Sequence, residues 1–254
     1  MKLGFSESPP SRYESGSQKA RILTEAWASA QVFCPSCGHP KLSQFQNNQP
    51  VADFYCFNCK EEFELKSQKS GFGVKVADGA YRTMCDRLAS DNNPNLMLLN
   101  YTPDIGVNNL FVVPKQFFTL EIIEERKPLA ATARRAGWIG CNILLSRVPE
   151  AGKIHIVREG QVIERENVLA RWRKTMFLRE GSTAARGWLL NVLKCVEDIG
   201  KPEFELDDVY AFETRLTGLF PQNRHVRQKI RQQLQVLRDG GFLIFLGRGR
   251  YRTA

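Results

Sequence analysis

Two Cys-x-x-Cys pairs constrain the folding of this chain more than any other feature of its sequence. Cys34 and Cys37 form the first pair, Cys56 and Cys59 form the second, and eighteen residues separate the pairs. Each pair predicts a tight turn, here called a knuckle, that points both thiolates the same way, and two knuckles together offer a tetrahedron of sulfur ligands. Because four thiolates leave no open position, we expect a structural Zn²⁺ ion. An iron–sulfur cluster, which also takes four thiolates, is the alternative.

The second knuckle also predicts how the residues around it pair. If it is the tip of an antiparallel hairpin, Asp53 lies directly across from Glu64, and strand alternation adds Lys66 to the same face. The alternate positions are apolar and should point to the core: Phe54, Phe63 and Leu65. Two facing carboxylates are unfavourable unless a cation lies between them. A Mg²⁺ ion, which takes one or two carboxylates together with water and phosphate oxygens, suits this position.

Composition narrows the class of protein. At 254 residues, with 43% hydrophobic and 25% charged residues, the chain predicts an ordinary globular protein with two domains. It contains no apolar run suited to a signal sequence or a membrane span, so we expect a cytoplasmic, reducing location in which cysteines bind metals or stay free. Three further cysteines fit no pair and are expected to be buried: Cys85, Cys141 and Cys195.

The order of predicted elements favours an α/β core, because strands and helices alternate through the first two thirds of the chain. Helices are expected over 17–31, 78–90, 114–125 and 167–178, and strands over 95–101, 109–114, 153–157 and 161–164. The polar stretch 179–187 predicts a linker. Three helices and a hairpin should follow it.

The end of the chain concentrates positive charge. From Gln222 to Ala254 there are eight Lys or Arg residues and a single acid, Asp239. A helix that Asn223 can cap would carry an apolar stripe on one side: Val226, Ile230, Leu234 and Leu237. Its opposite side would carry Arg224, Arg227, Gln228, Arg231 and Gln235. The closing stretch FLIFLGRGRYR predicts a hairpin with Arg248 between two glycines.

Three helices, the third of them basic, followed by a hairpin resemble a winged-helix domain over residues 183–254. In that family the third helix enters the major groove and the hairpin touches the DNA backbone. The resemblance therefore implies that the five polar residues of the third helix contact bases or phosphates and that Arg248 contacts the backbone. Arg pairs well with guanine and Gln with adenine. A winged helix used for protein docking is the alternative, which the basic charge disfavours.

The hairpin residues resemble the PD-(D/E)xK nuclease motif. Pro50-x-x-Asp53 is followed by Glu64-Leu65-Lys66, with one additional residue between Pro and Asp. The resemblance implies that Asp53 and Glu64 hold a catalytic Mg²⁺ ion and that Lys66 orients or activates the attacking water. An acid of the first helix often joins this set, and Glu25 is the candidate. A solvated hairpin that carries the same charges is the alternative.

The whole chain resembles a family of methyl-directed restriction endonucleases, through SQKARILTEAW, VADFYC and EEFELKS, LAATARRAGWIGCNI, and KIRQQLQVLRD with GRGRYR. The resemblance implies cleavage of GATC sites whose adenine carries an N-methyl group. It also implies a PD-(D/E)xK domain with an inserted zinc ribbon over 1–182, a winged helix over 183–254, and duplex DNA rather than an obligate protein as partner. The alternatives are a transcription regulator without catalysis and a repair nuclease indifferent to methylation.

The stretch TARRAGWIGCN offers a further contact with DNA. It places Arg134 and Arg135 beside Gly137 and Trp138. An exposed Trp next to two cations suits apolar recognition of a base edge that bears a methyl group, with the Arg residues on phosphate or guanine. A Trp138 buried in the core is an equal alternative.

Overall fold

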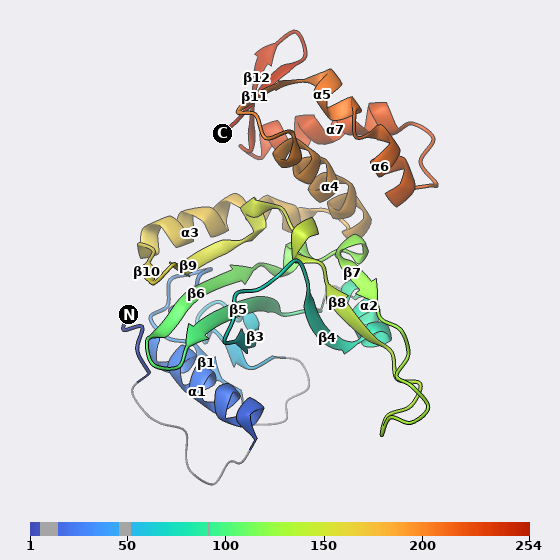
Figure 1. The fold of residues 1–254 in the computed structure, drawn as a ribbon. Coiled ribbons are helices and arrows are strands. Elements are labelled where there is room, and N and C mark those ends of the chain that lie inside the picture. Colours follow the sequence, from blue (N-terminus) through green and yellow to red (C-terminus); the bar gives the residue numbers. More distant parts are fainter. Residues whose placement is uncertain (6–14, 46–51, 91) are drawn as a thin grey trace. The chain divides into compact units, whose positions relative to one another are not determined.

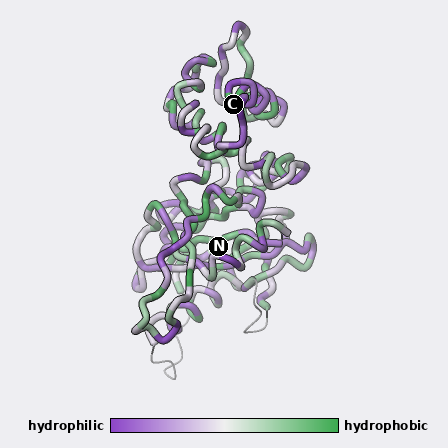
Figure 2. Tube along the Cα trace, turned by 90° about the vertical axis from the view of Figure 1, so that its right-hand side faces the viewer, coloured by the Kyte–Doolittle hydropathy of each residue, from purple (hydrophilic) through white to green (hydrophobic). Residues whose placement is uncertain are grey.

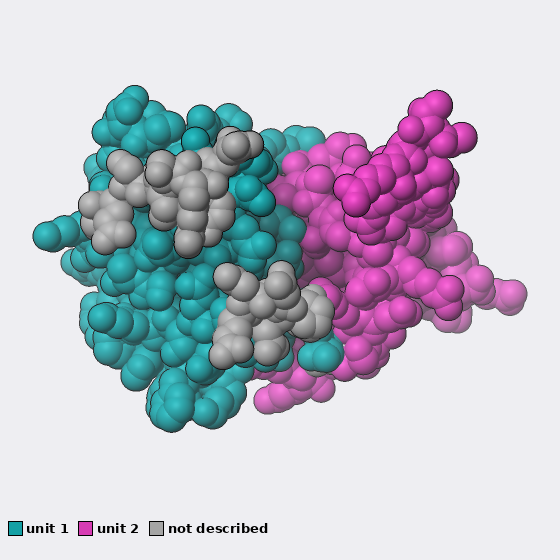
Figure 3. Space-filling view, turned by 90° about the horizontal axis from the view of Figure 1, so that it is seen from below, with its two compact units in different colours: residues 1–74, 92–115, 151–175 teal, residues 75–91, 116–150, 176–254 magenta. Residues whose placement is uncertain are grey.

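The computed structural model describes residues 1–5, 15–45, 52–90 and 92–254, so Pro50 of the nuclease motif lies outside the described residues. The chain folds into two compact units, each assembled from separate segments (Figures 1 and 3). Unit 1 comprises 1–74, 92–115 and 151–175, and unit 2 comprises 75–91, 116–150 and 176–254. None of the helices in the described ranges is both long and apolar enough to cross a membrane.

Unit 1 is built on a seven-stranded sheet with the order β1-β2-β3-β5-β6-β9-β10. Its strands are β1 (Ser43–Gln44), β2 (Phe54–Tyr55), β3 (Glu62–Gln68), β5 (Asn95–Thr102), β6 (Gly106–Val113), β9 (Ile154–Arg158) and β10 (Gln161–Val162). Only β3 and β5 pair in parallel among these neighbours. Helix α1 (Gly16–Gln31) packs against β3, and α3 (Arg165–Lys174) packs against β9 (Figure 1). The predicted α/β class is confirmed.

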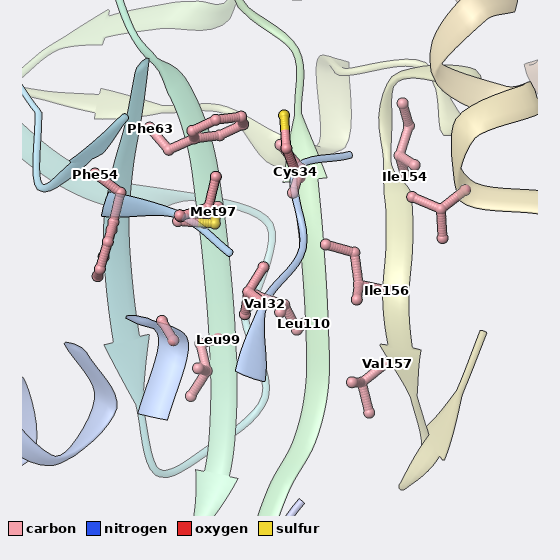
Figure 4. Packing of buried hydrophobic residues seen from close by; sticks show 14 of the residues in the cluster. Val32, Cys34, Phe54, Phe63, Met97, Leu99, Leu110, Ile154, Ile156 and Val157 are labelled. Atoms are coloured by element: carbon pink, nitrogen blue, oxygen red, sulfur yellow. The ribbon is translucent and has the colours of Figure 1, made fainter. Parts of the chain in front are cut away.

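The core of unit 1 lies around the central strands. Strand β5 is apolar on both faces, and Met97, Leu98 and Leu99 are fully buried, as expected for a strand covered on both sides. Phe54 and Phe63 of the predicted hairpin are also fully buried and belong to the same cluster (Figure 4). Leu65 is partly buried against it. The apolar face predicted for the hairpin is therefore the core face.

Unit 2 contains a small antiparallel sheet with the order β4-β8-β7, and here one prediction was wrong. The strands are β4 (Val76–Ala80), β7 (Ile123–Glu125) and β8 (Gly140–Ile143), with helix α2 (Tyr81–Ala89) after β4. The helix predicted over 114–125 is replaced by two short 3₁₀ turns, Lys115–Phe117 and Leu120–Ile122, and by β7. Pairing of β7 with β8 overrides the local helical pattern. The β-branched residues Ile122 and Ile123 favour an extended backbone over a helix, in agreement with this pairing. Two further 3₁₀ turns follow β8, at Leu145–Arg147 and Glu150–Gly152.

The remainder of unit 2 is a winged helix, as predicted. Its elements are α4 (Thr183–Ile199), β11 (Glu203–Glu205), α5 (Leu206–Tyr210), α6 (Glu213–Leu219), α7 (Val226–Asp239), β12 (Leu243–Gly247) and β13 (Arg250–Thr253). The three strands form a sheet with the order β11-β13-β12. The second of the three predicted helices is divided into α5 and α6, so α7 corresponds to the predicted third helix. Figure 2 shows the trace near the C-terminus coloured mainly hydrophilic, in agreement with the basic charge there.

The polar stretch 179–187 is not the linker that its composition suggested. A 3₁₀ turn covers Met176–Glu180, and α4 begins at Thr183. The Ser182 hydroxyl accepts a hydrogen bond from the Ala185 N–H at 3.3 Å and so caps α4. Arg186 is only 4% exposed and donates hydrogen bonds to the Gly181 carbonyl and the Thr183 hydroxyl. Polar residues that usually mark a linker serve here as a cap and as buried hydrogen-bonding groups.

Candidate functional site

The four paired cysteines converge on one point. The Sγ atoms of Cys34 and Cys59 are 3.6 Å apart, those of Cys37 and Cys56 are 3.5 Å apart, and all four lie within 4.8 Å of one another. Tetrahedral zinc with Zn–S bonds of about 2.3 Å has sulfur–sulfur edges of about 3.8 Å. In the part of the chain that the structure describes, this is the one group of three or more potential ligands gathered so closely. The cluster fits a structural zinc ion. Of the other cysteines, Cys141 and Cys195 are buried as expected, whereas Cys85 is partly exposed.

The two knuckles share one backbone geometry. The Gly38 N–H donates to the Cys34 carbonyl at 2.8 Å, and the Lys60 N–H donates to the Cys56 carbonyl at 2.9 Å. The residue after the second cysteine has positive φ in both, 78° at Gly38 and 61° at Lys60. Glycine adopts this conformation without strain, whereas a Lys there is held by its surroundings. A ligand shared by both knuckles would supply that restraint.

The electrostatics of the cysteines make metal binding sensitive to pH. Burial raises the pKa of the Cys34 thiol, and it raises the pKa of Cys59 to about 11. Burial alone would also raise the pKa of Cys37, but hydrogen bonds from Asn58 and from the backbone of His39 outweigh it and lower that pKa to about 7. Zinc binds thiolates, so the metal must displace protons when it binds.

The hairpin after the zinc cluster has the predicted register. Phe54 pairs with Phe63, and Tyr55 pairs with Glu62. The Asp53 N–H donates to the Phe63 carbonyl at 3.0 Å, one residue out of step with that register, so the regular ladder ends at Phe54 and Phe63. Asp53 and Glu64 directly adjoin this last pair. That they face one another stays a prediction.

Helix α1 completes a cluster of charges around Asp53. Arg21 binds Glu25 one helical turn later, and its Nη2 also lies 3.5 Å from Asp53 Oδ1. The other oxygen of Glu25 accepts a hydrogen bond from Gln44 Nε2 at 2.8 Å. The other oxygen of Asp53 accepts the Leu65 N–H at 2.7 Å. The hydrogen bond to Glu25 raises the pKa of the Arg21 guanidinium, which therefore keeps its positive charge.

Glu64 and Lys66 lie on the same face of β3. Lys66 Nζ is 2.9 Å from Glu64 Oε1, and both side chains are partly exposed. Three elements thus contribute carboxylates: α1 contributes Glu25, the segment before β2 contributes Asp53, and β3 contributes Glu64. Their hard oxygen donors fit a Mg²⁺ ion. Glu25 and Asp53 both contact the positively charged Arg21. The three acids are not drawn together as closely as the four cysteines.

Helix α7 presents the two faces that its sequence predicted. The apolar stripe is buried: Val226, Ile230, Leu234 and Leu237. The residues predicted for the polar face are exposed, although Arg224 lies in the turn before the helix: Arg224, Arg227, Gln228, Arg231 and Gln235. Asn223 does not cap the helix as expected, because His225 is the N-cap residue and Asn223 Oδ1 accepts the His225 N–H in the turn before it. An exposed basic face on the third helix suits entry into a DNA groove.

Two residues outside α7 organise its arginines. Arg227 Nε donates to Glu213 Oε2 at 2.8 Å, and its guanidinium lies 4.9 Å from the centre of the Tyr210 ring. Arg231 Nε donates to the Tyr210 hydroxyl. Tyr210 therefore holds two arginines of the recognition face in defined positions, which reduces the ordering that binding would require.

The wing places one cation at its tip. Gly247, Arg248 and Gly249 all have positive φ, at 96°, 51° and 76°. The flanking glycines allow this turn, and Arg248 is exposed between them. In β13, by contrast, Arg250 and Arg252 pair across the sheet with Glu205 and Glu203. Arg248 is thus the wing cation that lies outside the strand ladder.

The stretch around Trp138 lies in the long loop between β7 and β8 (Figure 1). Arg134 and Arg135 are exposed there, and Trp138 is partly buried rather than part of the core. The Arg135 guanidinium lies 4.8 Å from the centre of the Trp138 ring, and the ring packs against Gly140. The structure brings Arg135 and Trp138 together, and Arg134 is their exposed neighbour in the loop. Whether they contact DNA stays a prediction.

Sequence reasoning missed Arg21, Gln44, Tyr210 and Glu213. The spacing of Arg21 and Glu25, four residues apart on a predicted helix, indicated an ion pair but not its neighbour Asp53. Gln44, Tyr210 and Glu213 carry no comparable signal, because their partners are distant in sequence.

An α/β unit with a four-cysteine cluster, joined in one chain to a basic winged helix, defines a protein that acts on DNA. Comparison with known families gives the same conclusion in finer detail. Residues 1–181 match DpnI, the Dam-replacing family, and residues 184–253 match the Dam-replacing HTH domain. The chain belongs to the DpnI Dam-replacing family. Membership implies a methyl-dependent restriction enzyme, an endonuclease that binds DNA.

Proposed function

We propose that this protein is a Mg²⁺-dependent endonuclease that hydrolyses duplex DNA at GATC sites whose adenine is N-methylated. The observation that supports it most directly is the group of charges at the end of the hairpin, where Asp53 adjoins the last strand pair and accepts the Leu65 N–H, and Lys66 lies 2.9 Å from Glu64. We propose that residues 1–182 carry the nuclease and that 183–254, a part of unit 2, form the winged-helix DNA-binding domain. The methylated GATC site comes from the family resemblance.

The proposed roles follow from the contacts of each side chain. Asp53 and Glu64 would hold the Mg²⁺ ion, with Glu25 as a further ligand, and the ion would supply Lewis acidity toward the scissile phosphate. The Leu65 N–H fixes Asp53 Oδ2, which orients the carboxylate. Lys66 Nζ, held 2.9 Å from Glu64 Oε1, would orient the attacking water and stabilise its developing negative charge.

Recognition of the DNA would fall to exposed residues of unit 2. Arg224, Arg231 and Arg248 would contact phosphates, and Arg227, Gln228 and Gln235 would face base edges. In the loop between β7 and β8, Arg134 and Arg135 would bind phosphate or guanine, while Trp138 would offer an apolar surface to the methyl group.

A plasmid digest tests this function. Methylated and unmethylated plasmids are incubated with Mg²⁺ and with wild-type protein, Asp53→Ala, Lys66→Ala, or Lys19→Ala as an exposed control on α1. We expect the wild type and Lys19→Ala to cut only methylated plasmid. The Asp53 and Lys66 variants should bind the methylated site without cutting it.

Three results would contradict the proposal. Cleavage by Asp53→Ala near the wild-type rate would place the active site elsewhere. Equal cleavage of both plasmids would remove the methyl dependence. A wild-type protein that shifts DNA and leaves it intact would indicate a regulator without catalysis.

A further inference from the structure

Two partly buried carboxylates share a single cation in the proposed active site. The side chains of Glu25 and Asp53 are 10% and 20% exposed, and both lie against the Arg21 guanidinium. Two acids this close and this buried repel each other unless a positive charge lies between them. Arg21 supplies that charge in the structure.

The remaining contacts hold the acids in place independently of Arg21. Gln44 binds the second oxygen of Glu25, and the Leu65 N–H binds the second oxygen of Asp53. Arg21 takes the first oxygen of each. Removal of Arg21 would therefore leave one oxygen on each carboxylate available, with both side chains still anchored by a neighbour.

Arg21 is also able to leave. Its side chain is 60% exposed, in contrast to the two acids. A guanidinium carries only donors and cannot ligate a metal, and its charge repels a divalent cation at the same oxygens. Arg21 and a divalent cation therefore exclude one another at this position.

We infer that Arg21 is a displaceable counter-ion of the metal site: it neutralises Glu25 and Asp53 in the metal-free protein and must move into solvent before a divalent cation binds them. This inference rests on the proposed function, because it takes the two acids as metal ligands. Arg21 stabilises the protein before the metal arrives and weakens metal binding by competition. The freed guanidinium becomes available to a DNA phosphate.

The test measures metal binding and stability rather than cleavage. Full-length wild type, Arg21→Ala, Arg21→Lys and the control Lys19→Ala are titrated with Mg²⁺ and Mn²⁺ by calorimetry, without DNA. Thermal unfolding is followed with and without saturating Mg²⁺. We expect Arg21→Ala to bind Mg²⁺ on the order of fivefold more tightly than wild type, the factor that corresponds to one ion pair of this kind.

Loss of Arg21 should destabilise the metal-free protein and should favour its Mg²⁺-bound form. Arg21→Ala should melt at a lower temperature than wild type without metal and should gain more than wild type from saturating Mg²⁺. Arg21→Lys retains a positive charge and should stay closer to wild type. Arg21→Gln, which is neutral but polar, replaces Arg21→Ala if that variant does not fold. Lys19→Ala should match wild type in every measurement.

The outcomes separate this inference from the proposed function. Mg²⁺ affinity that is unchanged or weaker than wild type in the neutral Arg21 variant would overturn the counter-ion role, even if the enzyme cuts DNA. Equal Mg²⁺ affinity in wild type and Asp53→Ala would instead show that the acids are not the metal ligands. That result would overturn the proposed function along with the inference.

Discussion

Replacement of Arg248 by Ala tests how the winged helix holds DNA. Arg248 lies in the turn between β12 and β13, exposed and outside the strand ladder, so its charge is available to a phosphate. Each phosphate contact releases counterions and contributes about 0.9 to the negative slope of log affinity against log salt concentration. Arg248→Ala should therefore flatten that slope by about 0.9.

The predicted magnitude can be measured directly. Between about 50 and 200 mM salt, a slope difference of about 0.9 changes the ratio of mutant to wild-type affinity by about 3.5-fold. Fluorescence anisotropy would follow binding in the Asp53→Ala background without divalent metal, so that no duplex is cut. The flattening should be the same on methylated GATC duplex and on scrambled duplex, because a phosphate contact carries no sequence information.

A matched control comes from the same wing. Arg252 lies across from Glu203 in the sheet, so an acid is available to pair with its charge, and Arg252→Ala should flatten the slope less than Arg248→Ala. An affinity ratio for Arg248→Ala that stays constant across salt concentrations would refute a phosphate contact. A loss confined to the methylated duplex would show that Arg248 reads sequence instead.

Four further predictions follow from the zinc cluster and from α7. Purified protein should contain about one zinc per chain, and Cys56→Ser should lose both the metal and folded structure; elemental analysis that finds iron or no metal would contradict this. Burial raises the pKa of two of the four thiols, so zinc affinity should fall by more than about tenfold per pH unit as the pH drops below 7. Chelator competition measures this affinity, and an affinity that does not change with pH would exclude thiolate ligation. Glu213→Ala removes an acid paired with Arg227 on the recognition face and should raise the affinity for DNA at low salt; a lower affinity confined to the methylated site would mean that Glu213 positions Arg227 for a base edge. Leu234→Ala removes a fully buried side chain and should lower the free energy of unfolding by about 2 to 5 kcal/mol in urea titrations, whereas Gln235→Ala, next to it but exposed, should change it by less than about 0.5 kcal/mol.

The sequence alone determined the features that depend on local geometry. The spacing of the cysteines predicted both knuckles, and the second knuckle then predicted the register that pairs Phe54 with Phe63, because an antiparallel hairpin has one register once its turn is known. In the same way, the helical period of α7 separated its buried stripe from its basic face. These patterns repeat every few residues. Because the apolar side of each element must be buried, only one register or orientation is possible.

Only the tertiary structure decided what depends on partners distant in the chain. The segment 114–125 has a helical pattern, yet β7 forms there because β8 supplies a strand to pair with. The stretch 179–187 has the composition of a linker, yet Arg186 is buried, and both terminal nitrogens of its guanidinium donate to neighbouring oxygens. Arg21 reaches Asp53, and Tyr210 orders Arg227 and Arg231, through contacts that no local pattern encodes. Packing therefore decides which charges surround the acids and the recognition face. An ion pair requires only that two side chains lie close in space, so it produces no periodic pattern in the sequence.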